Sequence, residues 1–135
     1  MTEKSVHERP RPEARFAGES HVFDLPAALR QLRAEAQTAA QHGHRQITIF
    51  HRGALTHALF AFQPGGELAD HAARGVVTIH AIEGHLTVRA GEDTYELTGG
   101  MMVVLAPNVR HSVCAGESSG AAMLLTVCRE SSDAG

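Results

Sequence analysis

Between Pro64 and His111 the chain reads PGGELADHAARGVVTIHAIEGHLTVRAGEDTYELTGGMMVVLAPNVRH. Short apolar runs alternate here with glycine, proline and charged turns, a pattern typical of β-strands joined by tight loops. His71 and His111 stand at the two ends of this stretch, each beside a turn. Because a small closed sheet can bring distant side chains together, and imidazole is the commonest protein metal ligand near neutral pH, this pair is the main functional candidate.

The strand-like pattern continues on both sides of this stretch. Eight short segments carry it, and they cover residues 47–50, 54–62, 76–82, 85–90, 94–97, 101–105, 111–115 and 121–127. Short strands at this spacing favour a sandwich or a closed barrel, in which few sheet edges stay exposed. We therefore expect an all-β domain over residues 46–129.

One helix is expected before the barrel, within residues 21–45. Asp24 is a candidate N-cap, Pro26 would lie in the first turn, and Gly43 is a candidate for the end of the helix. Apolar residues recur at helical spacing and define one face, made of Leu25, Leu29, Leu32 and Ala36. We expect this face to pack on the outside of the barrel or on a second subunit.

Length and composition limit the classes of function. The 135 residues suffice for one domain with a core, and a net charge of −3 gives no reason to expect nucleic acid or an anionic membrane as a partner. Residues 1–20 are expected to be a disordered leader without a secretory signal, and residues 130–135 a polar tail. No apolar run approaches the roughly 18 residues of a membrane span. We therefore expect a cytoplasmic protein, in which Cys114 and Cys128 are buried free thiols.

Two motifs in this chain resemble those of the cupin superfamily. The family's first motif is a glycine, His-x-His, three or four residues, a Glu and a further glycine; here Pro64-Gly65-Gly66 opens it and Ala81-Ile82-Glu83-Gly84 closes it. The second motif, Gly-x5-Pro-x-Gly-x2-His, corresponds to Gly100 followed by the run Ala106-Pro107-Asn108-Val109-Arg110-His111. Asn108 replaces a glycine and is among the few other residue types that tolerate a positive φ. The resemblance implies a cupin-type double-stranded β-helix, or jelly-roll barrel, with one N-terminal helix.

The resemblance implies only two of the family's four usual metal ligands in this chain. Counting back from Gly84, the first histidine of the motif is His71, while the second falls on Ala73 and the glutamate on Val77. The histidine of the second motif is His111. Because a divalent metal generally needs at least three protein donors, two histidines form an incomplete set unless another group joins them.

Four other residues near the expected site are weaker candidates. His80 should alternate to the outward face, unless a bulge changes the register. Glu67 is a better carboxylate candidate than Asp70, which points away from its neighbouring histidine if that segment is extended. His57 lies on the preceding strand and is a candidate for the pocket, although no spacing rule sets its direction. Four further histidines without ligand spacing are expected on the solvated surface, and these are His7, His21, His42 and His44.

Three functions remain open. In the first, the barrel binds a small molecule between His71, His111 and apolar walls, with or without a divalent metal such as iron, manganese, zinc or nickel. The walls of this pocket would include Phe60, Phe62, Leu86, Val88 and Leu105. In the second, the chain is a metal-dependent enzyme of the dioxygenase, isomerase or decarboxylase type. In the third, it is a non-catalytic structural or sensor domain that forms a homodimer, for which Met101 and Met102 are candidate interface residues.

Overall fold

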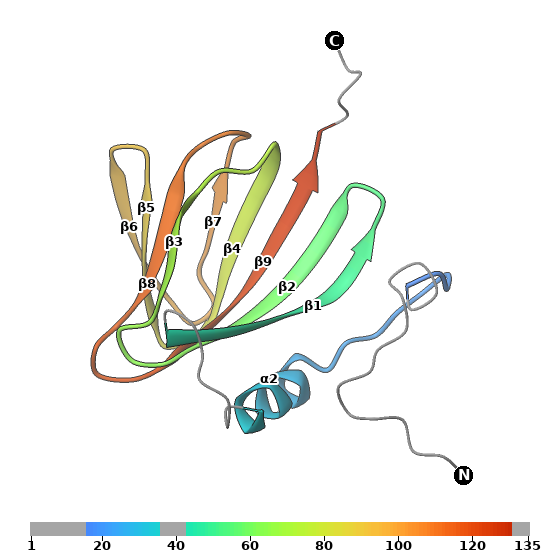
Figure 1. The fold of residues 1–135 in the computed structure, drawn as a ribbon, viewed down its shortest axis with the longest axis horizontal. Helices are drawn as coiled ribbons and strands as arrows, with labels where there is room; N and C mark the ends of the chain where they lie inside the picture. Colours follow the sequence, from blue (N-terminus) through green and yellow to red (C-terminus); the bar gives the residue numbers. More distant parts are fainter. Residues whose placement is uncertain (1–15, 36–42, 131–135) are drawn as a thin grey trace.

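The computed structural model describes residues 16–35 and 43–130, in which nine strands and one helix are found (Figure 1). The strands form two antiparallel sheets that face one another, so the predicted all-β jelly-roll architecture is confirmed. Most of the predicted leader, the C-terminal residues 131–135 and the segment 36–42 lie outside the described residues.

The two sheets differ in size. The five-stranded sheet has the order β1 (His44–Arg52), β2 (Leu55–Phe62), β9 (Ala121–Arg129), β4 (Gly75–Glu83) and β7 (Met102–Leu105). The four-stranded sheet has the order β3 (Glu67–His71), β8 (His111–Ala115), β5 (His85–Ala90) and β6 (Asp93–Thr98). Each of the eight predicted segments overlaps a strand, and β3 is a ninth strand that the sequence pattern does not predict. Its sequence ELADH carries no apolar alternation, and only Leu68 packs against the core.

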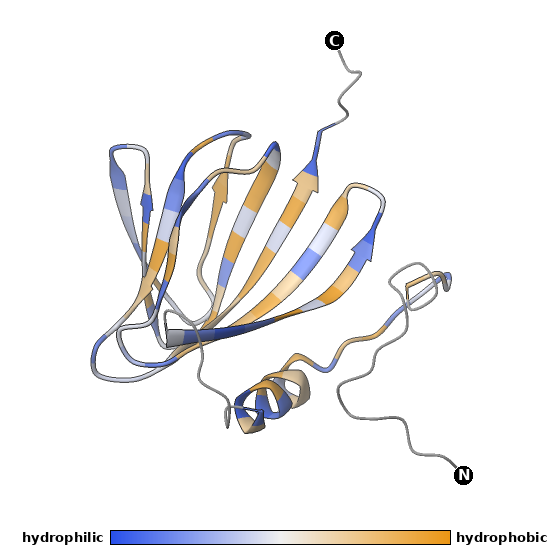
Figure 2. Ribbon diagram, in the orientation of Figure 1, coloured by the Kyte–Doolittle hydropathy of each residue, from blue (hydrophilic) through white to orange (hydrophobic). Residues whose placement is uncertain are grey.

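The main core lies between the two sheets and follows from the alternation of side chains along the strands. In β8 the inward positions His111, Val113 and Ala115 are buried, and in β5 the inward positions Leu86 and Val88 are fully buried. Apolar residues accordingly recur along the strands in Figure 2. The core also contains the predicted wall residues Phe60, Phe62 and Leu105. Burial of apolar surface on this scale is what holds the two sheets face to face.

The helix α2 (Leu25–Ala34) covers the outer face of β1 and β2 (Figure 1). Its predicted N-cap is confirmed, because the Asp24 carboxylate accepts a hydrogen bond from the Ala27 amide at 3.0 Å. Leu29 and Leu32 bury their side chains in a second core against the outer face of β2. The helix ends at Ala34, well before the predicted end at Gly43. Within the described residues no helix is long and apolar enough to cross a membrane.

In the second motif, Asn108 adopts the positive φ that its place in the motif predicts. Asn108 has a φ of +68° and is the non-glycine residue with positive φ among those described. Its amide donates to the Ala73 carbonyl at 2.8 Å. The loop before β8 is therefore tied to the segment that joins β3 to β4.

The prediction for the two cysteines is wrong. Cys114 and Cys128 are free thiols, but both are exposed rather than buried. Cys114 lies between the buried residues Val113 and Ala115, so strand alternation turns its side chain outward. An apolar sequence context alone does not tell which face of a strand a residue takes.

Candidate functional site

The structure brings His71 and His111 together between the two sheets. They are direct partners in the antiparallel pairing of β3 with β8, and their ring centroids lie 4.2 Å apart with the ring planes 59° apart. The pairing of two strands that are distant in sequence thus places both imidazoles at one point.

A bulge in β3 produces this arrangement. The register of β3 against β8 shifts between Leu68 and His71. Residues three positions apart on a regular strand face opposite sides of the sheet. Here Leu68 packs against the core while His71 contacts the buried ring of His111, so the extra residue of the bulge turns both side chains inward.

Each of the two imidazoles donates a hydrogen bond from Nδ1 to the carbonyl two residues before it. The His71 Nδ1 lies 3.0 Å from the Ala69 oxygen, and the His111 Nδ1 lies 3.0 Å from the Val109 oxygen. A carbonyl oxygen only accepts, so Nδ1 carries the proton in both rings. The neutral form of each ring therefore presents an unprotonated Nε2, which accepts a hydrogen bond or binds a metal.

His111 is the more deeply buried of the two and is only 1% exposed. Its Nε2 is buried and has no hydrogen-bond partner among the described residues. Desolvation by burial lowers the pKa of His111 below its ordinary value of about 6.5. The bond to the Val109 carbonyl opposes this shift, the positive charge of a protonated His71 adds to it, and the Asp70 carboxylate opposes it more weakly. His111 is accordingly a neutral hydrogen-bond acceptor at neutral pH.

The protein donors near this pair do not complete a metal site. Val77 is 2% exposed within the core, and Ala73 packs against the same core, so apolar groups occupy both positions at which the family has ligands. Among the described residues no group of three or more histidine, cysteine, aspartate or glutamate side chains is placed to hold a metal ion. Two imidazole nitrogens are fewer donors than a divalent metal generally needs. The donor set therefore does not fit a metal held by the protein alone.

The carboxylates considered as a third ligand lie elsewhere. Glu67 is exposed. Asp70 is exposed as well, and its Oδ2 lies 3.1 Å from the Arg110 Nε in an ion pair outside the core. Asp70 thus points away from His71, as the sequence predicts for extended backbone.

The structure does not place His57 with the histidine pair. Its Nδ1 forms a 2.8 Å hydrogen bond with the Thr126 hydroxyl, and its ring packs against Phe50. Residues 58, 60 and 62 of β2 belong to the core between the sheets, so alternation puts His57 on the opposite, outer face. His80 is half-buried, with Met102 and Leu124 as its strand partners, and also takes the outer face.

Phe60 and Phe62 lie on the inner face, with their ring centroids 6.0 Å apart. His44, expected on the surface, is half-buried and packs against both of these rings. Its Nδ1 donates to the Glu67 carbonyl at 2.8 Å, which connects the start of β1 to β3. His44 contacts these rings because β1 pairs with β2, which carries both phenylalanines. The sequence alone does not show which strands are neighbours, so it did not predict this contact. His21 is also half-buried, whereas His7 and His42 lie outside the described residues.

Comparison with known proteins agrees with this architecture. Residues 58–128, just over half of the chain, match the family model Cupin_2, described as a cupin domain. No curated protein matches the chain. Similar solved structures include a conserved protein of unknown function, SPY1581, from Streptococcus pyogenes, which is 19% identical with a TM-score of 0.65 over 85% of this chain and 92% of that one.

Two further structures have comparable similarity. The protein TT1209 from Thermus thermophilus is 25% identical, with a TM-score of 0.62 over 81% of this chain and 98% of that chain. An RmlC-like cupin from Shewanella frigidimarina is 22% identical, with a TM-score of 0.60 over 68% of this chain and 81% of that chain. Similarity at this level of identity supports the fold.

Proposed function

This chain belongs to the Cupin_2 family of cupin domains, and on that basis we propose that it binds a small organic molecule inside the barrel against His71 and His111. The observation that carries the proposal is the buried Nε2 of His111, which has no partner among the described residues. A buried polar atom without a hydrogen bond costs about 1–3 kcal/mol. A ligand that donates to this nitrogen removes that cost, and such orphaned groups are uncommon in native cores.

The chemistry of the pair selects the kind of ligand. Both Nδ1 atoms already donate to backbone carbonyls, so each neutral ring offers only an acceptor at Nε2. The complementary ligand groups are donors, such as hydroxyl or amide N–H groups. Apolar residues of the inner faces, Phe60 and Phe62 among them, suit a ligand that also has an apolar part.

A metal would have to receive donors from the ligand itself. His71 and His111 would supply two nitrogens to an iron, manganese, zinc or nickel ion, and a chelating ligand would supply the others. The same donor count weighs against the alternative of a metal-dependent dioxygenase, isomerase or decarboxylase, whose chemistry requires a firmly held metal.

We further propose that the chain forms a homodimer through the outer face of the five-stranded sheet. Met102 and Val104 of β7 are 56% and 57% exposed, and Val76 of β4 is 38% exposed. Thr78 is the strand partner of Val104, and His80 is the partner of Met102, so these side chains share one face. Large apolar residues gathered on one exposed face are typical of protein interfaces.

Elemental analysis and thermal denaturation of untagged protein test the binding proposal. We expect far less than one metal ion per chain, and a melting temperature that rises with a hydroxyl- or amide-bearing ligand from a small-molecule library. His111→Gln should abolish this rise, whereas Arg30→Gln, a control at an exposed position of the helix, should keep it. One metal ion per chain that is lost in both His71→Ala and His111→Ala would contradict the proposal.

A further inference from the structure

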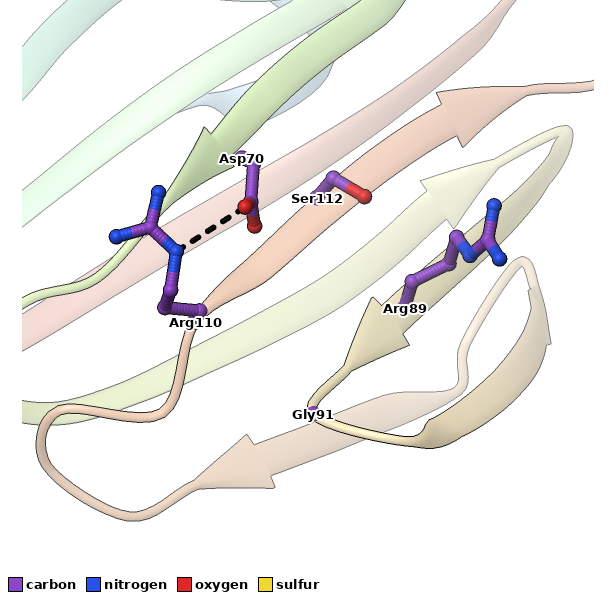
Figure 3. Close-up of a pocket in the computed structure, with 5 residues that line it drawn as sticks. All are labelled: Asp70, Arg89, Gly91, Arg110 and Ser112. Carbon is purple, nitrogen blue, oxygen red and sulfur yellow. Dashed lines mark hydrogen bonds and ion pairs between the residues drawn. The ribbon is translucent and has the colours of Figure 1, made fainter.

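The outer face of the four-stranded sheet carries a hollow of about 430 Å³ (Figure 3). It lies on the opposite side of β8 from the buried ring of His111, because Ser112 alternates outward. Its lining residues are Asp70, Arg89, Gly91, Arg110 and Ser112. No part of the function proposed above uses these side chains.

Strand pairing places the groups around the hollow. Arg89 of β5 is the direct partner of Ser112 of β8, and both are outward positions between buried neighbours. The Gly91 amide donates to the Arg110 carbonyl at 3.1 Å, which ties the turn after β5 to the segment before β8. Backbone contacts therefore hold two walls of the hollow in place.

The lining has an excess of positive charge. It contains two arginines and one aspartate in a chain whose net charge is −3, so the positive charge is local. Within the described part of the chain, the Arg89 guanidinium has no hydrogen bond or ion pair. Arg110 uses its Nε for the Asp70 carboxylate, and its terminal nitrogens point away from Asp70, Ser112 and Arg89 in Figure 3, so Arg89 is the guanidinium beside Ser112.

We infer that this hollow is a binding site for a small oxyanion, a carboxylate or phosphate group, held by the Arg89 guanidinium with the hydroxyl of its strand partner Ser112 as a further donor. A guanidinium presents a planar set of N–H donors that matches the paired oxygens of both groups. Both arginines are accessible to solvent, so binding weakens as salt rises. The site is separate from the interior of the barrel, and its occupancy does not depend on a ligand at His71.

Titration of ¹⁵N-labelled protein with inorganic phosphate, and separately with succinate, tests this inference at an ionic strength held constant with sodium chloride. We expect saturating shifts of the Gly91 and Ser112 amide signals. Loss of one charge-assisted hydrogen-bond donor should weaken binding about tenfold in Arg89→Gln. Because Arg89 has no partner in the described structure, this variant should fold as the parent does. Arg30→Gln is the matched control, on the helix that packs against the other sheet.

Asp70→Asn provides a second test, in which anion binding should become tighter instead of weaker. It removes a negative charge from the lining of the hollow, so phosphate or succinate should bind more tightly than to the parent. Saturation by phosphate alone or by succinate alone identifies the group that the site prefers. Shifts that never saturate with either anion, or an affinity in Arg89→Gln equal to that in Arg30→Gln, would overturn the inference.

Discussion

The imidazoles of His71 and His111 face one another across the pairing of β3 with β8, with ring centroids 4.2 Å apart. On the other side of the same two strands, their chain neighbours Asp70 and Arg110 form an ion pair at 3.1 Å. The bulge in β3 allows both contacts to form, because it turns His71 inward and leaves Asp70 outward. The histidine pair is thus held in place by the pairing of β3 with β8 and by the ion pair between Asp70 and Arg110 on the outer side of these strands.

Acid should destabilise the protein through His111. Its pKa is lowered by burial in the folded state, so the unfolded chain binds more protons as the pH falls below the ordinary value of about 6.5. The contribution of the neutral ring is therefore fully present above that pH and is lost as the pH falls toward the lowered pKa. We expect the free energy of unfolding, measured in urea at a series of pH values, to decrease over this range.

The variant His111→Gln isolates this contribution. It removes the titrating group, so its stability should depend less on pH below about 6.5 than that of the parent. Arg30→Gln, at an exposed position of the helix, is the control and should keep the dependence of the parent. Equal slopes for His111→Gln and the parent would show that His111 does not resist protonation.

Restoring the absent ligands should create a metal site. In the double variant Ala73→His and Val77→Glu, we expect about one zinc or manganese ion per chain by elemental analysis, where the parent holds far less. Val77 is 2% exposed, so its new carboxyl group should lower the melting temperature without metal, and added metal should raise it again. Ala73→His with Val77→Gln is the control that lacks the anionic donor. A double variant with no more metal than the parent would contradict this ligand count.

If the proposed homodimer forms, one substitution in its interface should convert the protein from a dimer to a monomer. Val104→Glu places a charge on the exposed apolar face, so light scattering at micromolar concentration should give a monomer mass for this variant and a dimer mass for the parent. Tyr95→Glu is the control, because Tyr95 is 40% exposed on a strand of the other sheet. A monomer mass for the parent would refute the proposal.

Asn108 should tolerate glycine better than alanine. Its φ of +68° disfavours a residue with an ordinary side chain by roughly 1–2 kcal/mol. Asn108→Ala should lose about that much unfolding free energy in urea, while Asn108→Gly should stay close to the parent. Equal losses in both variants would indicate that the asparagine side chain matters more than its backbone conformation.

The parts of this structure that sequence predicts well are those with a single buried face. In β5 apolar residues alternate with polar ones, so the pattern identifies both the strand and its inner face. The start of the helix is predicted equally well, because Asp24 is a favourable N-cap residue and Pro26 is favourable in the first turn.

Two features escaped prediction for physical reasons. β2 is buried on both faces, by the main core and by α2, so its apolar run carries no alternation that would show where His57 points. In β3 one apolar residue contacts the core, and the bulge after it breaks the period of two. The inward direction of His71 therefore follows from pairing with β8, which local sequence does not encode.

The ¹⁵N spectrum of the His111 imidazole tests ligand binding inside the barrel most directly when it is recorded on untagged, chelator-treated protein during addition of small hydroxyl- and amide-bearing compounds. We predict a neutral ring at neutral pH with the proton on Nδ1, and an Nε2 signal that moves saturably as one of these compounds binds. A proton on Nε2, or an Nε2 signal that no compound moves, would contradict the central claim.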